Sequence, residues 1–530
     1  MGQRLEIYDT TLRDGAQREG ISYSVEDKLK IARKLMELGI PYIEGGYAAS
    51  NPKDEEFFRR AQGLDWGSSL IAAFGSTRRA GTTAAQDPSL RAMVDAKTKV
   101  VTIVGKSWDL HVTDILETTL EENQNMIADS VAFLKSRDRL VFFDAEHYFD
   151  GFKRNPDYAL NTIKAAARAG ADRIILCDTN GGVMPKELQA AIQAARAAVP
   201  TVLGIHVHSD TELAVGNSVL AVEEGCIQVQ GCINGYGERC GNANLCSLIP
   251  NLQLKLGYDC LPPEKLTKLT EVSHFVSETA NLIPDPHQPY VGTSAFAHKA
   301  GLHVAAVLKH EMSYQHIEPT LVGNHKRVVV SELSGRGNIL YKAEELGLTH
   351  LLQGDLAREL AQRIKEMESR GYQFEGAEAS FELLLRRAQK DYRPPFEVLD
   401  FSVGVEKRQF EAPEPAGNTI SSRSTVKLRV AGEELLMAGE GNGPVNALDA
   451  ALRKALNHFY PSLAVVHLTD YKVRILDEAA GTGAWVRVLI ESSDGQDEWT
   501  TVGASQNIIE ASWTALTDSL EYWLARRQAL

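Results

Sequence analysis

Short apolar segments alternate with amphipathic helical segments along roughly the first 235 residues of the chain. Each apolar segment ends in polar residues, and helical patterns such as the one from Ser24 to Leu38 end before a glycine, here Gly39. Eight strands are predicted: Leu5–Asp9, Tyr42–Gly45, Ser69–Phe74, Val100–Val104, Leu140–Ala145, Arg173–Cys177, Val202–His208 and Cys226–Ile233. Eight strand–helix units at intervals of roughly 25 to 40 residues favour a TIM (β/α)8 barrel over an open doubly wound sheet.

The pattern changes after the eighth strand. We expect a barrel domain over residues 1–262, helical linker subdomains over 263–395 and a C-terminal α+β domain over 396–530. The last region has strand patterns near 424–430, 463–476, 484–491 and 498–502, and a Pro-rich loop at Ala412–Pro415. The length of the chain therefore reflects three regions with different secondary structure.

The C-terminal region contains an internal repeat. The segment Asn446–Leu452 matches Asn507–Trp513 in the order Asn, apolar, apolar, acid, Ala, small, apolar, and each copy follows strands and begins a helix. The pattern predicts two similar β-rich units, each closed by a helix, in a regulatory or dimerisation domain. The alternative is that both segments are merely helix N-terminal signatures. The glycine-rich run Gly441-Asn442-Gly443-Pro444 before the first copy is a candidate ligand-binding loop.

Composition limits the partners that the chain can bind. The sequence has 56 Lys and Arg against 70 Asp and Glu, a formal charge of −14, which argues against a general nucleic-acid or anionic-membrane surface. No apolar run approaches the roughly 18 residues that span a bilayer, and no signal peptide is evident, so a cytoplasmic location is expected. The six cysteines form no C-x-x-C pair and are expected to be reduced thiols, mostly buried.

Two histidines of the seventh predicted strand are candidate metal ligands. His206 and His208 are two residues apart, so their side chains project from the same face of a strand, at the end of the barrel where active sites lie. A lone His-x-His pair is weak evidence, because such pairs also occur by chance. The first strand adds Arg13 and Asp14 at the same end, and Asp14 would supply the oxygen ligand that two histidines lack. Two His and one Asp suit Zn, Mn, Co or Mg without selecting one of them.

Further polar side chains follow other predicted strands. Arg13 can stabilise an oxyanion, although a mutual surface ion pair with Asp14 is the alternative. Asn242 belongs to a glycine-rich loop after the eighth strand and can offer an amide oxygen to a metal. Glu146 is a candidate general base and Thr179 lies in a polar end that can bind a carboxylate, whereas isolated acids at strand ends are often only solvated.

Three of these motifs together resemble a known family. Asp9–Gly15, His206-x-His208 and the loop Asn234–Asn242 are similar, in this order, to the acyl-CoA-condensing metalloenzymes that include 2-isopropylmalate, homocitrate and citramalate synthases. The C-terminal repeat, with Gly441–Ala447, resembles the amino-acid-sensing domain of these enzymes, so the resemblance covers nearly the whole chain. Within the family, the segments Ile43–Gly46, Ser50–Asp54 and Phe143–His147 resemble most the longer (R)-citramalate synthases.

The resemblance implies a reaction and roles for individual residues. A divalent metal would bind Asp14, His206 and His208, with Asn242 as a further ligand, and pyruvate would chelate it. Arg13 would neutralise the developing alkoxide of the condensation with acetyl-CoA, and Thr179 would hold the substrate carboxylate. The base that deprotonates acetyl-CoA would involve Glu146 and His303, with Tyr314 closing the same pocket.

The resemblance also implies regulation and assembly. Isoleucine would inhibit the enzyme at the C-terminal domain, where Gly441–Pro444 is the candidate site, and the chain would form a homodimer. Three alternatives remain: a 2-isopropylmalate or homocitrate synthase acting on another 2-oxo acid, a retro-aldol lyase, which generally lacks the C-terminal module, and a non-catalytic metabolite sensor.

Overall fold

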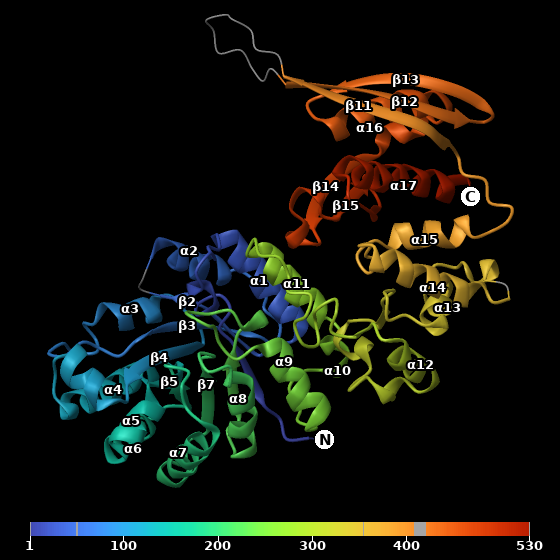
Figure 1. Cartoon of the computed structure of the whole chain (residues 1–530). Coiled ribbons are helices and arrows are strands. Elements are labelled where there is room, and N and C mark those ends of the chain that lie inside the picture. The colour runs from blue at the N-terminus through green and yellow to red at the C-terminus, as the bar shows by residue number, and fades with distance from the viewer. Residues whose placement is uncertain (1, 49–50, 353, 408–419, 529–530) are drawn as a thin grey trace, which may run out of the picture. The chain divides into compact units, whose positions relative to one another are not determined.

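A computed structural model describes residues 2–48, 51–352, 354–407 and 420–528 of the chain. It divides into two compact units, one of residues 1–296 and 317–326 and the other of 297–316 and 327–530 (Figure 1). Ser50 and the Pro-rich loop Ala412–Pro415 lie outside the described residues. Each unit is described by itself below.

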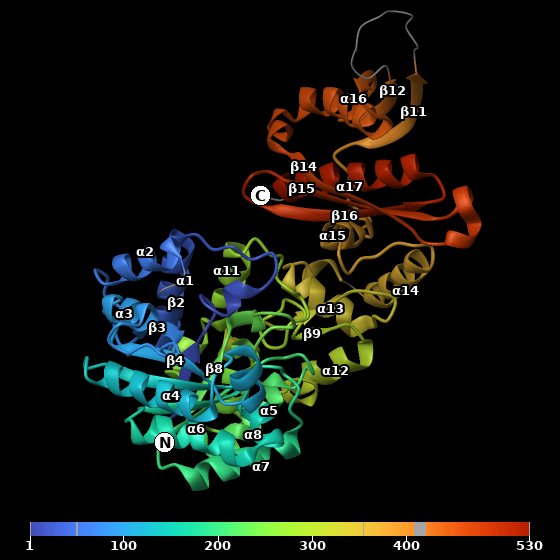
Figure 2. The same cartoon turned by 90° about the vertical axis from the view of Figure 1, so that its left-hand side faces the viewer.

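The first unit is a closed barrel of eight parallel strands in sequential order, β1 to β8 (Figures 1 and 2). Its strands are β1 (Glu6–Asp9), β2 (Tyr42–Tyr47), β3 (Leu70–Ser76), β4 (Val100–Lys106), β5 (Leu140–Glu146), β6 (Arg173–Asp178), β7 (Leu203–Val207) and β8 (Gln228–Gly231). Every predicted strand is present, and the β1–β8 pairing closes the barrel that spacing alone could not prove. The TIM-barrel prediction is therefore confirmed.

Helices surround the barrel strands and follow them in the chain. They are α1 (Val25–Leu38), α2 (Pro52–Ala61), α3 (Pro88–Asp95), α4 (Leu120–Lys135), α5 (Tyr148–Arg154), α6 (Pro156–Arg168), α7 (Pro185–Ala198), α8 (Ala214–Glu223), α9 (Leu245–Pro250), α10 (Pro263–Leu266) and α11 (Leu269–Thr279). The first helix shows why the sequence signals work: Ser24 and Asp27 form a reciprocal capping box, and Gly39 ends the helix with φ of 94°. A continuous core of buried aliphatic and aromatic side chains fills the space between strands and helices.

The second unit begins with a helical region. Of the linker predicted over 263–395, residues 263–296 and 317–326 belong to the first unit and the remainder to the second. This region of the second unit contains a two-stranded parallel sheet of β9 (Ala297–His298) and β10 (Arg327–Val328). Its helices are α12 (Gly301–Lys309), α13 (Arg336–Glu345), α14 (Leu356–Ser369) and α15 (Glu378–Arg387). Buried Ile339, Leu360 and Phe381 belong to one apolar cluster that joins the last three helices.

The rest of the second unit consists of two similar halves. Each has a three-stranded antiparallel sheet followed by one helix: β11 (Glu397–Lys407), β12 (Ile420–Val430), β13 (Glu433–Gly441) and α16 (Pro444–Phe459), then β14 (His467–Ile475), β15 (Val486–Ser493), β16 (Glu498–Ser505) and α17 (Ile508–Gln528). Figure 2 shows α17 beside β15 and β16. The two copies of the sequence repeat lie in α16 and at the start of α17, so the repeat marks real structural units.

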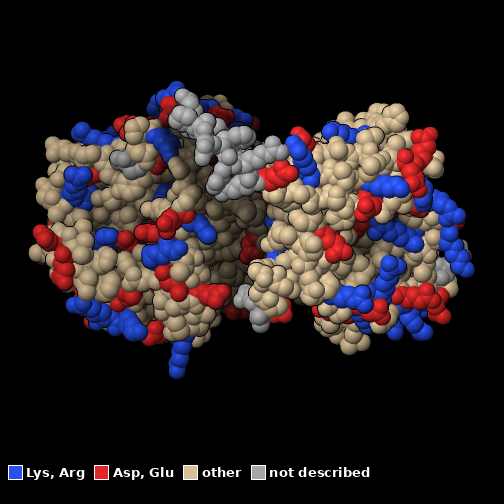
Figure 3. Space-filling view, turned by 45° about the horizontal axis from the view of Figure 1, so that its top comes forward, with Lys and Arg blue, Asp and Glu red and all other residues tan. Residues whose placement is uncertain are grey.

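Positive and negative side chains share the surface of the molecule (Figure 3). Lys and Arg are interspersed with Asp and Glu over the face shown in Figure 3. Of the helices described, none is long and apolar enough to cross a membrane. All six cysteines are free thiols, and five are buried, as predicted; Cys240 is exposed.

Candidate metal centre and its surroundings

The candidate metal ligands meet at the carboxyl end of the barrel. Asp14 follows β1, His206 lies in β7 and His208 directly follows that strand. Asn242 forms an isolated antiparallel bridge with His208, which brings the loop after β8 onto the same site. A Cβ atom at Gly237 would lie 2.1 Å from Nδ2 of Asn242, so the loop needs a glycine there to approach so closely.

Three of these residues have the geometry of a metal-binding cluster. Nε2 of His206 lies 3.5 Å and Nε2 of His208 lies 3.8 Å from Oδ2 of Asp14, and the two Nε2 atoms are 3.3 Å apart. The candidate ligand atoms all lie within 4.8 Å of one another, and the three residues are buried. Two imidazole nitrogens and a carboxylate oxygen converging on one point are a donor set for a divalent metal.

Neighbouring groups orient these donors. Nδ1 of His206 lies 3.0 Å from Oε1 of Gln230, which acts only as an acceptor, so the Nδ1–H form is favoured and Nε2 keeps its lone pair. Nδ2 of Asn242 donates to Oδ1 of Asp14 at 2.9 Å. Oδ1 of Asn242 and Nδ1 of His208 are buried without a hydrogen-bond partner within the described chain. A bound cation would satisfy the orphaned amide oxygen, so these residues fit a metal.

The electrostatics favour the metal-binding forms of Asp14 and His208. Burial lowers the pKa of His206, but Asp14 outweighs burial and raises it. Burial alone would raise the pKa of Asp14, but Arg13 and then the two histidines hold it well below its usual range. Burial and the neighbouring His206 lower the pKa of His208 to about 3. Asp14 is thus an anion and His208 a neutral imidazole at neutral pH, which are the forms that bind metals.

Arg13 is fixed by two carboxylates and an aromatic ring. Its Nε forms an ion pair with Glu44, and its Nη1 lies 3.0 Å from Oδ2 of Asp14. The guanidinium carbon lies 4.0 Å from the centre of the Phe74 ring. The ion pair with Asp14 exists, but only 13% of the Arg13 side chain is exposed, so it is not the simple surface pair considered as the alternative. Arg13 therefore presents a preorganised positive charge beside the metal ligands.

Thr179, which follows β6, is oriented by the backbone of His147, which follows the neighbouring strand β5. Its Oγ1 accepts a hydrogen bond from the backbone N–H of His147 at 3.0 Å, so its hydroxyl proton is free to point elsewhere. His147 adopts a left-handed conformation with φ of 54°, which is uncommon for a residue with a side chain. This backbone turn places a hydroxyl donor at the rim of the barrel.

Glu146 lies at the end of β5 and forms an ion pair with Lys106 at the end of β4. About a fifth of its side chain is exposed, so it is neither buried nor freely solvated. The acid is therefore held in place by a cation, which the sequence prediction of an isolated strand-end acid did not include.

The other predicted residues belong to the second unit. The rings of His303 and Tyr314 stack with their centres 4.2 Å apart and an angle of 25° between the planes. In the glycine-rich loop, the N–H of Asn442 donates to Oδ1 of Asn446 at 3.1 Å, and Pro444 begins α16. Each pair is formed within that unit.

Sequence reasoning missed two residues of the barrel site. Glu44 is fully buried in β2, where it accepts hydrogen bonds from Tyr8 at 2.7 Å and from Arg13. Gln230, in β8, contacts His206. The available signal was an acid or amide inside a strand expected to be buried, because such a group requires a polar partner.

The fold and cluster define a TIM-barrel protein with a candidate divalent-metal centre, and sequence comparisons narrow the class. The family described as HMGL-like matches residues 4–276. The family described as homocitrate synthase post-HMGL domain-like matches residues 290–372, and the LeuA allosteric (dimerisation) domain matches residues 375–524.

Full-length relatives identify the particular family. The (R)-citramalate synthase of Geobacter sulfurreducens is 54% identical over 526 residues, covering 99% of this chain and 98% of the relative. That of Aquifex aeolicus is 52% identical over 99% of both chains. The probable 2-isopropylmalate synthase of Methanopyrus kandleri is 31% identical over 100% of both. The chain belongs to the HMGL-like family and, within it, to the (R)-citramalate synthases, as its motifs predicted.

Proposed function

We propose that this chain condenses acetyl-CoA with pyruvate and hydrolyses the resulting thioester, giving (R)-citramalate and CoA. The observation that carries the proposal is the buried cluster of Asp14, His206 and His208 beside the fixed guanidinium of Arg13. The names of the full-length relatives at 46–54% identity support the same reaction. The 2-isopropylmalate synthases are more distant, at 30–31% identity, and provide the second candidate.

The cluster would hold one divalent metal, Mn, Zn, Co or Mg, on Asp14, His206 and His208, with Oδ1 of Asn242 as a further ligand. Such an ion supplies Lewis acidity toward the ketone of a 2-oxo acid. Gln230 keeps His206 in the tautomer that exposes Nε2.

Arg13 and Thr179 bind the 2-oxo acid in this proposal. As the ketone carbon is attacked, negative charge develops on its oxygen, and the Arg13 guanidinium stabilises that charge. Glu44 holds Arg13 in place through an ion pair with its Nε. The Thr179 hydroxyl, whose oxygen already accepts from His147, donates to the substrate carboxylate.

Carbon–carbon bond formation requires removal of a methyl proton from acetyl-CoA. Glu146 and His303 form the base assembly in this proposal, with Tyr314 closing the pocket. Ion pairing to Lys106 holds Glu146, and stacking on Tyr314 holds the His303 ring. The methyl carbon then bonds to the ketone carbon, whose oxygen becomes a hydroxyl after protonation. Water finally cleaves the thioester, releasing the CoA thiol and the new carboxylate.

Regulation and assembly follow the division into a catalytic barrel (1–262), linker subdomains (263–395) and a regulatory domain (396–530). We propose that isoleucine, the end product of the pathway that citramalate enters, binds at Gly441–Pro444 and inhibits turnover. The match to an allosteric dimerisation domain over 375–524 supports this role and a homodimer. The hydrogen bond between Asn442 and Asn446 ties the candidate loop to α16.

Release of CoA, followed with a thiol reagent, tests the proposed reaction. Pyruvate, 2-oxoisovalerate and 2-oxoglutarate are compared in the presence of Mn or Zn. Turnover fastest with pyruvate supports the proposal, fastest turnover with 2-oxoisovalerate supports the second candidate, and no turnover with any 2-oxo acid rejects both.

A further inference from the structure

One cavity of the second unit is lined by more cations than acids. It has a volume of about 390 Å³ and lies among residues of α14, the segment after that helix, β14 and β15. Lys299, Lys365, Arg474 and Arg487 line it, together with three glutamates. All of these residues belong to the same unit, so the cavity is complete within it.

Two of the cations face each other across neighbouring strands. Arg474 and Arg487 are directly opposite in the antiparallel pairing of β14 with β15, an arrangement that destabilises a sheet when the charges are alike. Within the described parts of the chain, neither guanidinium forms an ion pair, and Arg487 donates to neutral acceptors. These are the carbonyls of Gly371 at 2.5 Å and Tyr372 at 3.4 Å and Oε1 of Gln373 at 2.6 Å. Partial burial and then Arg474 lower the pKa of Arg487, and the opposing effect of Glu368 does not cancel this shift.

Two of the three glutamates that line the cavity already have partners. Glu375 forms an ion pair with Lys299 at 2.9 Å. Glu368 accepts from the backbone N–H groups of Glu332 at 2.5 Å and Phe374 at 3.1 Å. Burial, together with the neighbouring Glu332 carboxyl, raises the pKa of Glu368 to about 7, which reduces the negative charge in the cavity near neutral pH. The cavity therefore retains an excess of positive charge.

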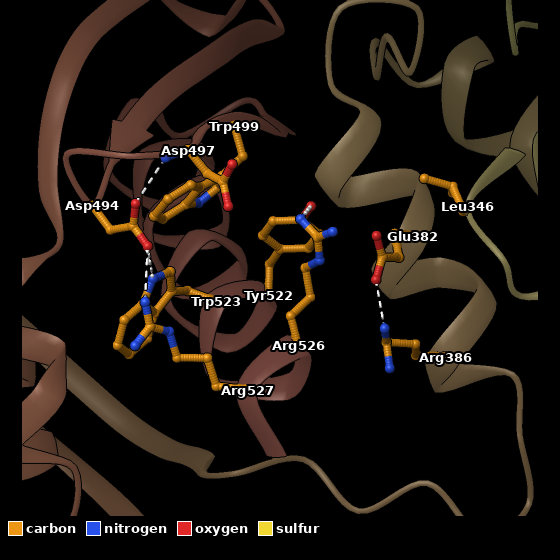
Figure 4. Close-up of a pocket in the computed structure, with 10 residues that line it drawn as sticks. All are labelled: Leu346, Glu382, Arg386, Asp494, Asp497, Trp499, Tyr522, Trp523, Arg526 and Arg527. Carbon is orange, nitrogen blue, oxygen red and sulfur yellow. Dashed lines mark hydrogen bonds and ion pairs between the residues drawn. The ribbon is translucent and has the colours of Figure 1, made fainter. Parts of the chain in front are cut away.

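A larger pocket of the same unit shows the opposite arrangement. In the pocket of about 500 Å³ drawn in Figure 4, Arg386 pairs with Glu382 at 2.6 Å and Arg527 with Asp494 at 3.2 Å. Arg526 donates to the hydroxyl of Tyr522 at 3.0 Å. The arginines of the larger pocket therefore have partners within the chain. Arg474 and Arg487 of the smaller cavity form no ion pair in the described parts of the chain, so a bound anion is the partner they lack.

We propose that the cavity between β14, β15 and the end of α14 is a binding site for a phosphate-bearing anion held by Arg474 and Arg487. The planar donor groups of two guanidiniums match phosphate oxygens, and Lys365 adds a third charge at the rim. More than one unpaired cation favours a polyvalent phosphate over a single carboxylate. The proposal does not depend on the reaction of the barrel.

Titration calorimetry of the full chain with pyrophosphate at fixed ionic strength tests the site. Arg474 is the residue to change, because it is exposed and makes no hydrogen bond in the described structure, whereas Arg487 holds residues 371–373. We expect wild type to bind pyrophosphate, R474Q to bind it at least about tenfold more weakly, and the control R526Q to bind it like wild type. Pyrophosphate can also release heat by chelating the metal of the barrel site. This heat is the same for wild type, R474Q and R526Q, so it does not affect the comparison of the three proteins.

Thermal unfolding provides a second readout that a merely structural role of Arg474 would not reproduce. Without pyrophosphate, R474Q should unfold at a higher temperature than wild type, because the repulsion from Arg487 is gone. With saturating pyrophosphate, wild type should gain more in its unfolding midpoint than R474Q. Absence of wild-type binding, or equal affinity in wild type and R474Q, would overturn the proposal.

Competition identifies the source of the anion. CoA and dephospho-CoA are added to the pyrophosphate titration of wild type and R474Q. Displacement that depends on Arg474 assigns the site to the phosphates of the coenzyme, and pyrophosphate binding that neither compound displaces assigns it to a free phosphate-bearing metabolite. Both outcomes support an anion site.

Discussion

The side-chain amide of Asn242 donates through Nδ2 to Oδ1 of Asp14 at 2.9 Å while its own oxygen is buried without a partner in the described structure. The amide nitrogen thus orients the carboxylate of Asp14, a candidate metal ligand, and the amide oxygen is itself a further candidate ligand. Replacing Asn242 by Ala removes both contributions, so we expect metal affinity to fall by about 10- to 100-fold with the fold retained. Competition with a fluorescent chelator measures the affinity. Unchanged affinity would show that the loop after β8 plays no part in metal binding.

Asp14→Ala should remove the anionic ligand altogether. The variant should lose its metal on dialysis, measured by elemental analysis, and release CoA at below about one hundredth of the wild-type rate. Asp65→Ala is a suitable control, since this exposed acid accepts only from the backbone N–H of Gly67 among the bonds described. Undiminished metal content and turnover in the Asp14 variant would refute the assignment.

Glu44→Gln tests whether the ion pair between Glu44 and Nε of Arg13 is needed to keep Arg13 in place. The substitution leaves Arg13 without its Nε carboxylate, so the guanidinium can shift, and we expect kcat to fall about tenfold to a hundredfold with a smaller change in KM. Tyr8→Phe is the matched control, because it removes the other hydrogen bond to Glu44 and leaves the ion pair intact. Equal losses in the two variants would mean that the whole polar network, not the ion pair, sets the rate.

Asp9 makes the stability of the barrel depend on pH. Burial raises its pKa to about 7, although Thr11 donates to both of its oxygens. The folded chain therefore binds this proton more tightly than the unfolded chain, whose Asp titrates near 3.9. Stability should fall as pH rises from about 4 to 7, by up to about 4 kcal/mol. Thermal unfolding of wild type and Asp9→Asn across this pH range checks the sign. The unfolding midpoint of the variant should rise relative to that of wild type as pH rises. A difference between the two midpoints that stays constant with pH would contradict the assignment.

The internal repeat supplies a matched test of the effector site. Asn446→Ala removes the acceptor that ties Asn442 to α16, and we expect inhibition by isoleucine to weaken at least about tenfold while uninhibited turnover persists. Asn507→Ala changes the corresponding residue of the second half, whose Oδ1 accepts from Ile509, and should leave inhibition intact. Dose–response curves for isoleucine decide between the two halves, and equal inhibition of both variants would place the effector elsewhere.

The barrel was predictable because its parallel strands are buried on both faces and therefore form continuous apolar runs. The strands β11 and β13 were not predicted. In β13, Glu433 and Glu434 begin the strand and Gly439 and Gly441 end it, so its apolar run is limited to residues 435–438 and does not alternate with polar residues. Antiparallel pairing with β12, across the two-residue turn Ala431-Gly432, stabilises the strand.

The meeting of Asp14, His206 and His208, the candidate metal ligands, was predictable because the positions of these residues at strand ends determine where their side chains lie. The side chains that hold these ligands and Arg13 in place were not predictable. Glu44 and Gln230 act through contacts with residues 31 and 24 positions away in the chain, to Arg13 and His206. The left-handed backbone at His147, which orients Thr179, leaves no signal in the residue type. Such contacts arise only when the barrel closes.

The most direct test of the account is the rate of CoA release from acetyl-CoA with each 2-oxo acid, measured for metal-loaded wild type and for the same protein after chelation. The account predicts the highest kcat/KM with pyruvate, loss of turnover on chelation and its recovery when Mn, Zn, Co or Mg is added back. Turnover that survives complete removal of the metal, or a preference for 2-oxoisovalerate or 2-oxoglutarate, would contradict it.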